Sequence, residues 1–153
     1  MSNEDFLQIC GAISGSITDP YSDQADKHAE RYYSAIRKRK DDIEKIAANT
    51  KYTIEQVTDV KNYVFMEKHD LGDGDFDYFD PSCSMAQSWQ RLIDGKNIQP
   101  HDLTMMEHEL MELTLVNQGF SQNDAHNITS KQYNYRKESE EYYGKIKKHQ
   151  TGQ

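Results

Sequence analysis

The stretch PHDLTMMEHELMELTLVN, residues 100–117, decides the fold class that we predict for this chain. Its apolar residues recur at steps of three and four, the spacing of one face of an α-helix. That apolar face consists of Leu103, Met106, Leu110 and Leu113. His108 and Glu112 lie on roughly the opposite side, one turn apart, so their side chains can meet. Apolar neighbours flank this pair, and we expect such surroundings to perturb its acid–base behaviour.

Helix signals continue outward from this stretch in both directions. A capping box begins at Thr53, with Gln56 three residues later. Asp80 and Pro81 form a further helix start, with Asp as the N-cap and Pro in the first turn, and Gly95 ends that helix. The other helices are expected over residues 23–48, from about Ser121, and over residues 135–148.

The sequence contains no internal repeat and no convincing strand pattern. The predicted fold class is therefore all-α, a single compact domain of about six helices with one long acidic ordered loop. Residues 1–20 are expected to form a weakly structured lead, and residues 21–153 the helical domain.

The acidic ordered loop is the segment EKHDLGDGDFDYFDP, residues 67–81. Its alternating aspartates, as at the start of a calcium-binding loop, are Asp73, Asp75 and Asp77. However, Tyr78 stands where an EF-hand needs glycine, and Ser84 stands where it needs glutamate, which excludes that motif. We expect aromatic side chains to be tucked beneath the loop, namely Phe76, Tyr78 and Phe79.

The composition bounds the functions that the chain can have. Its formal net charge is −8 at pH 7. This sign counts against a nonspecific binder of duplex DNA, which needs a broad basic face.

Neither the cysteines nor the N-terminal region indicates export. Cys10 and Cys83 are far apart and not in a metal-binding spacing, so we expect no disulfide framework and a reduced, cytoplasmic setting. The apolar patch over residues 6–17 follows Glu4 and Asp5, where a signal peptide carries basic residues. We therefore expect no signal peptide, no membrane span and no membrane partner.

One hypothesis for the polar pair is a metal site. His108 and Glu112 have the i, i+4 spacing with which two side chains hold one ion. Glu109 stands where the general base lies in an H-E-x-x-H helix, although the second histidine is here a glutamate. A third ligand must come from another part of the chain, either His126 or His101. The cofactor would be Zn²⁺ or another divalent metal.

A second hypothesis needs no metal. His108 and His126 would exchange protons, with Glu109 or Glu112 as the orienting group and Arg91 as an anion clamp. The substrate would then be a phosphodiester such as RNA.

The alternative to both is structural. His108 and Glu112 would form a buried hydrogen-bonded pair that locks two helices together, with His126 packed nearby and no chemistry.

Several phrases of the sequence occur together in one family of domains. They are RYYSAIRKRKDDIEKIAANT (31–50), NYVFMEKHDLGDGDFDYFDP (62–81), MAQSWQRLIDG (85–95), DLTMMEHELMEL (102–113) and DAHNITSKQYNY (124–135). In their order and spacing, over about residues 24–145, they resemble a C-terminal domain of phage head-morphogenesis (minor head) proteins and polymorphic-toxin-like proteins of Gram-positive bacteria and their prophages. None of the phrases is a recognised catalytic signature.

The resemblance implies a prophage or secreted-effector setting, with a toxin-like nuclease or other hydrolase activity. The protein would act in the phage particle or in a target cell, and its partner would be an immunity or phage-head protein. The polar residues within the phrases are the implied site candidates: Arg31, His69, Arg91, His108, Glu109, Glu112 and His126. The acidic chain departs from the basic character of many nuclease toxins, which leaves small-molecule or protein substrates open. The competing interpretation is a non-catalytic phage accessory or interaction module.

Overall fold

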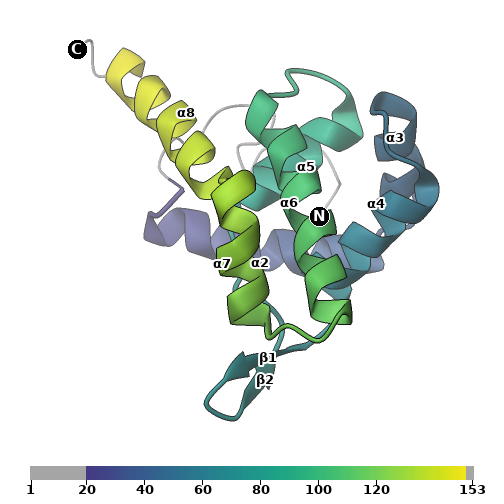
Figure 1. The fold of residues 1–153 in the computed structure, drawn as a ribbon. Coiled ribbons are helices and arrows are strands. Elements are labelled where there is room, and N and C mark those ends of the chain that lie inside the picture. Colours follow the sequence, from purple (N-terminus) through teal and green to yellow (C-terminus); the bar gives the residue numbers. More distant parts are fainter. Residues whose placement is uncertain (1–19, 151–153) are drawn as a thin grey trace.

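The computed structural model describes residues 20–150, and it is built almost entirely from helices (Figure 1). Within these residues there are seven α-helices, one short π-helix and one two-stranded sheet. The helices are α2 (Asp23–Lys38), α3 (Asp42–Asn49), α4 (Ile54–Lys61), η1 (Asn62–Met66), α5 (Cys83–Asp94), α6 (Pro100–Asn117), α7 (Gln122–Gln132) and α8 (Tyr135–Gln150). The predicted helical class is confirmed, and the small sheet departs from it.

The predicted lead, including Cys10, lies outside the described residues except for Pro20. None of the helices within residues 20–150 has the length and apolarity that a membrane crossing requires.

The predicted helix over residues 23–48 is in fact two helices, α2 and α3, with a break at Arg39. The backbone of Arg39 is extended, with φ −76° and ψ 139°. The ammonium of Lys61 donates to the carbonyl oxygen of Arg39 at 2.7 Å and to Oδ1 of Asp42 at 2.9 Å. Because Asp42 begins α3 and is fully buried, one lysine ties the end of α2 to the start of α3. Local apolar spacing does not encode this long-range contact.

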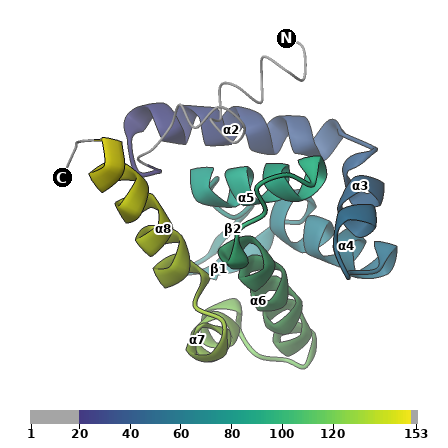
Figure 2. The same cartoon turned by 90° about the horizontal axis from the view of Figure 1, so that it is seen from above.

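The core is built around α5, which lies between α2 and α6 and also contacts α3 (Figure 2). Trp89 and Leu92 of α5 are completely buried. The Trp89 ring lies 5.1 Å from that of Phe65 in η1, and Phe65 lies 4.7 Å from Tyr33 of α2, both edge to face. Such aromatic pairs stabilise a fold by more than the burial of their apolar area alone, so η1 is held firmly against the core.

Helix α5 begins later than the sequence pattern predicts. Ser82 is its N-cap, and Oγ of Ser82 accepts a hydrogen bond from the backbone N–H of Met85 at 3.3 Å. The expected cap at Asp80 with Pro81 in the first turn is therefore wrong, because serine two residues later supplies an equivalent oxygen. The predicted end at Gly95 is confirmed, with a left-handed φ of 67°.

The acidic segment after η1 folds as a β-hairpin, where a loop was expected. Strand β1 (His69–Gly72) pairs antiparallel with β2 (Asp75–Asp77), and the hairpin projects away from the helices (Figure 1). Phe79 packs against the core and Tyr78 is half-buried. Phe76 is 66% exposed, so the expectation that it is tucked beneath the segment is wrong.

Candidate metal centre

Helix α6 turns a largely polar side towards the rest of the protein. Its buried residues are His101, Asp102, Met105, Met106, His108, Glu109 and Glu112. Of the predicted apolar face, Met106 is fully buried and Leu110 and Leu113 pack partly buried against the core, whereas Leu103 is 38% exposed. Polar groups are buried in this way where neighbouring elements satisfy them, so the partners of these side chains explain the orientation of α6.

Three side chains from α6 and α7 meet at one point. Nε2 of His108 lies 3.3 Å from Oε1 of Glu112 and 3.3 Å from Nδ1 of His126. Nδ1 of His126 lies 2.8 Å from the same Oε1. Helices α6 and α7 run side by side, joined by a short turn, in both ribbon views (Figures 1 and 2). Of the two candidates for a third ligand, the structure thus brings His126 to the pair.

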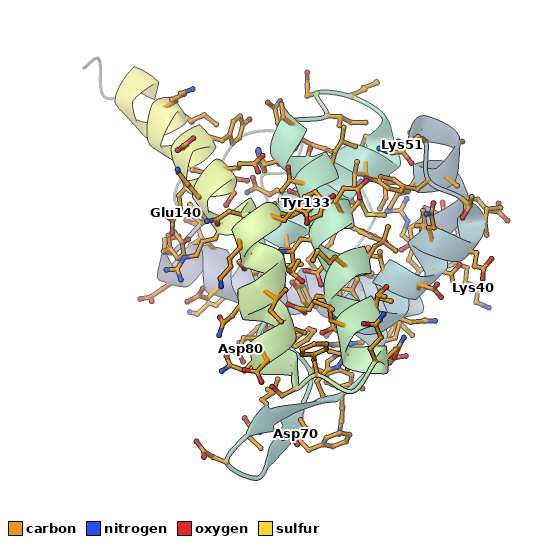
Figure 3. All side chains as sticks on the ribbon, viewed as in Figure 1. Lys40, Lys51, Asp70, Asp80, Tyr133 and Glu140 are labelled. Carbon is orange, nitrogen blue, oxygen red and sulfur yellow. The ribbon has the colours of Figure 1, made fainter. Side chains whose placement is uncertain are left out.

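Two further contacts orient these atoms. Nδ1 of His108 lies 2.8 Å from the backbone carbonyl oxygen of Tyr133, which ends α7 and lies beside α6 (Figure 3). Because a carbonyl oxygen can only accept, Nδ1 carries the hydrogen, and Nε2 is left facing Glu112. The hydroxyl of Tyr63 donates to Oε2 of Glu112 at 2.6 Å, which leaves Oε1 facing the two histidines. In metalloproteins, hydrogen bonds of this kind hold the metal-binding side chains in a fixed orientation.

The spacing of the three facing atoms fits a small tetrahedral ion. With ligand distances of about 2.0–2.1 Å, tetrahedral geometry places neighbouring donor atoms about 3.3 Å apart. Two of the three separations here are 3.3 Å and the third is 2.8 Å. Among the described residues, this trio is also the group of histidine, cysteine and acidic side chains whose possible ligand atoms all lie within 4.8 Å of one another.

The contacts within the cluster set the charges of its members. Burial by itself raises the pKa of Glu112, but hydrogen bonds from His108, His126 and Tyr63 outweigh it and lower the pKa to about 2. Burial acts to lower the pKa of His108, whereas its contacts with Glu112, Glu109 and a backbone carbonyl raise it overall. The cluster therefore holds an ionised Glu112 carboxylate within hydrogen-bond distance of two imidazole nitrogens, where a divalent cation could bind.

A pocket of about 860 Å³ reaches the cluster. His108, Glu109 and His126 all line it. The His126 side chain is 51% exposed, whereas that of Glu112 is 3% exposed. The cluster is therefore anchored in the interior on the Glu112 side and accessible from solvent on the His126 side.

Glu109 has the environment of a proton acceptor rather than that of a ligand. It is 8% exposed and lines the pocket. Burial, reinforced by the charge of Glu112, raises the pKa of Glu109 above its usual range, and His108 opposes the rise. A carboxyl with a raised pKa is suited to general acid–base chemistry.

Arg91 does not join this cluster, contrary to the prediction of an anion clamp. Its guanidinium donates to Asp102 twice, from Nε at 2.8 Å and from Nη2 at 2.7 Å. Nη2 also lies 3.1 Å from Nε2 of His101. His101 therefore belongs to this second buried group and not to the cluster of His108, Glu112 and His126. A guanidinium whose Nε and Nη2 both bond to a buried carboxylate has little capacity left for a substrate anion.

The remaining residues implied by the resemblance are dispersed. Arg31 is exposed on α2 and lies outside the pocket lining. His69 lies on β1, and its Nε2 donates a hydrogen bond to the backbone carbonyl oxygen of Tyr63 at 2.6 Å. Tyr63 itself was missed by the sequence analysis, because one tyrosine among ten carries no local signal for a contact 49 residues away.

No family model, no curated protein and no solved structure matches this chain.

Proposed function

We propose that this chain is a metal-dependent hydrolase domain in which His108, Glu112 and His126 bind Zn²⁺ or a similar divalent ion. The observation that carries the proposal is the triangle of Nε2, Oε1 and Nδ1, with sides of 3.3, 3.3 and 2.8 Å, at the end of a solvent-accessible pocket. A set of two histidines and one glutamate with an open position is characteristic of catalytic rather than structural zinc sites.

Glu109 would be the general base of the reaction. When bound, the ion supplies Lewis acidity, polarising a carbonyl or phosphoryl oxygen and acidifying water. Glu109 follows the ligand His108 in the chain and lines the same pocket, and a cation bound beside it would favour the ionised carboxylate that accepts a proton. A positioned base of this kind contributes about 10²–10⁴-fold to a reaction rate.

The charges around the pocket favour a neutral carbonyl substrate, an ester or an amide, over a polyanion. Asp26 and Asp80 line the pocket. Among the described residues of the lining, Arg136 is the one arginine or lysine, and it bonds to Glu140 at 3.0 Å. Arg91 is paired with Asp102. RNA recognition needs free cations for the phosphates, so RNA is the weaker candidate among the substrates considered.

The resemblance to phage head-morphogenesis and toxin-like domains supplies the biological setting that we propose. In that setting, expression of the domain would arrest growth, and the arrest would be lost in a folded Glu109→Gln variant. Harmless expression of the wild-type chain would count against a toxin.

Metal binding is tested on protein purified without chelator. Metal analysis and titration with Zn²⁺ should give one ion per chain. The His126→Ala variant removes a half-exposed ligand and should bind at least about 10-fold more weakly. His28→Ala, on α2 and outside the cluster, is the matched control. Absence of stoichiometric binding by the wild-type chain would exclude the metal centre.

Hydrolysis is tested with a panel of fluorogenic peptides, simple esters, total RNA and plasmid DNA. Glu109→Gln should bind the metal as the wild type does and lose about 10²-fold or more in kcat, because the amide cannot accept the proton. Equal turnover by both proteins would exclude Glu109 as the base. Cleavage of RNA alone would contradict the preference for a carbonyl substrate.

The second candidate is a non-catalytic interaction module, and one observation favours it. Glu112 is satisfied without any ion, through contacts to Tyr63, His108 and His126. Such a network would join η1, α6 and α7 by itself. Loss of stability in Glu112→Gln, together with no metal binding by the wild type, would support this alternative.

A further inference from the structure

Tyr63 connects the core to the proposed metal ligand. It lies in the π-helix η1, and its hydroxyl donates to Oε2 of Glu112 at 2.6 Å. Both side chains are buried, with Tyr63 5% and Glu112 2% exposed. Single-turn π-helical segments are rare and frequently occur at functional sites.

Other residues hold the Tyr63 ring in place. Its centroid lies 4.6 Å from that of His69 and 5.3 Å from that of Phe79, both edge to face. His69 stacks on Phe79 at 4.0 Å and donates to the backbone carbonyl of Tyr63. That carbonyl lies in the last turn of η1, where backbone acceptors need partners from outside the helix. The β-hairpin and the segment after it therefore fix the tyrosine.

We propose that Tyr63 is a positioning residue that restricts Glu112 to binding the ion through Oε1 alone. This inference rests on the proposed metal centre. The hydroxyl hydrogen bond occupies Oε2, while Oε1 is the atom within 3.3 Å of both histidine nitrogens. Without the hydroxyl, the carboxylate could rotate and bind through both oxygens, which would fill the open coordination position. Outer-shell partners of this kind typically change metal affinity by about 10–100-fold.

The test compares Tyr63→Phe with a matched control, Tyr52→Phe. Tyr52 is also 5% exposed, and its hydroxyl donates at 2.8 Å to Oε1 of Glu107, a glutamate of α6 outside the cluster. Each substitution removes one tyrosine–glutamate hydrogen bond onto the same helix and leaves the ring. Only the first touches a proposed ligand.

The measurements are the Co²⁺ dissociation constant and the visible absorption spectrum of the Co²⁺ protein, which reports coordination number. Tyr63→Phe should weaken binding by about 10-fold or more and lower the absorption intensity, as expected when a fifth ligand atom enters. Tyr52→Phe should leave the affinity within about 2-fold of wild type and the spectrum unchanged. Circular dichroism and thermal unfolding establish that both variants are folded.

The outcomes separate this inference from the proposed function. If the wild-type chain does not bind Co²⁺, the metal centre itself fails. If the wild type binds, and Tyr63→Phe has the same affinity and spectrum, the positioning role fails while the metal centre stands. If Tyr63→Phe does not fold, His69→Leu decides, since it loosens Tyr63 while keeping the hydroxyl. Weaker Co²⁺ binding and a lower absorption intensity in His69→Leu then support the inference. A wild-type affinity and spectrum in that variant overturn it.

Discussion

Nε2 of His108 and Nδ1 of His126 lie 3.3 Å apart, although 18 residues separate them in the chain. The tight connection between α6 and α7, with Gly119 at φ 107°, brings the two helices together. Tyr133, at the end of α7, accepts a hydrogen bond from the other nitrogen of His108. One helical hairpin therefore supplies both histidines and the contact that fixes the tautomer of the first.

Metal binding to this pair should stabilise the fold. A ligand at about 100 times its dissociation constant adds about 2.7 kcal/mol to the free energy of unfolding. For a chain of this size the corresponding rise in Tm is about 5–10 °C. Thermal unfolding with Zn²⁺ and then with excess EDTA measures the effect and its reversal. His126→Ala should show a smaller rise at the same Zn²⁺ concentration, and an equal rise in that variant would mean that the ion binds elsewhere.

Arg91 should prove to be a stabilising residue rather than an anion clamp. Its side chain and that of Asp102 are 6% and 0% exposed. Arg91→Ala leaves a buried carboxylate without its cation and should cost about 3–5 kcal/mol, measured by urea unfolding. The double variant Arg91→Met, Asp102→Leu should be less destabilised. Lost hydrolysis at unchanged stability would instead restore the anion-clamp hypothesis.

His101 should make the fold sensitive to acid. Burial lowers its pKa to about 4, Asp102 opposes this, and Arg91 adds to it. The unfolded chain binds a proton near its ordinary pKa of about 6.5, whereas the folded chain resists protonation. The stability that His101 contributes is therefore present above about pH 6.5 and is lost as the pH falls towards 4.

The measurement is the free energy of unfolding of wild type and His101→Gln at pH 7 and pH 4.5. The charged groups facing His101 are Arg91 on α5 and Asp102 on α6. Its ring also lies beside three tyrosine rings of α8, those of Tyr135, Tyr142 and Tyr143. The wild type should lose about 1–3 kcal/mol more than the variant on acidification. Parallel losses in the two proteins would show that other groups control the acid response.

Gly95 should tolerate no side chain. Its φ is 67°, and a Cβ there would lie 2.7 Å from Cγ of Asn49. Asn49 cannot move freely, because its amide donates to the carbonyls of Leu92 and Ile93 at 3.0 and 2.9 Å. Gly95→Ala should cost about 2–4 kcal/mol by urea unfolding. Gly74→Ala is the control.

The control has a similar conformation without the clash. Gly74 has φ 78° in the hairpin turn, with no atom within 4 Å of an added Cβ. Gly74→Ala should therefore show only the conformational cost of about 1–2 kcal/mol. Equal losses for the two variants would mean that contact with Asn49 is unimportant.

Local signals in the sequence were sufficient for several elements. The Thr53 and Gln56 capping box is present, and α6 spans the predicted residues 100–117. Both depend on contacts within about one helical turn, which sequence spacing reports directly. The break at Arg39 was not predictable in the same way, because it depends on Lys61, 22 residues away.

For the candidate site, the sequence by itself determined that His108, Glu109 and Glu112 share one helix, with His108 and Glu112 one turn apart. Helical geometry fixes that relation wherever the helix lies. Only the tertiary structure decided that His126 joins His108 and Glu112, and that Tyr63 donates a hydrogen bond to Glu112. The same is true of the salt bridge between Arg91 and Asp102. These partners come from different elements, and the packing of α5, α6, α7 and η1 sets their distances. The spacing of residues within one segment of the sequence does not indicate these distances between elements.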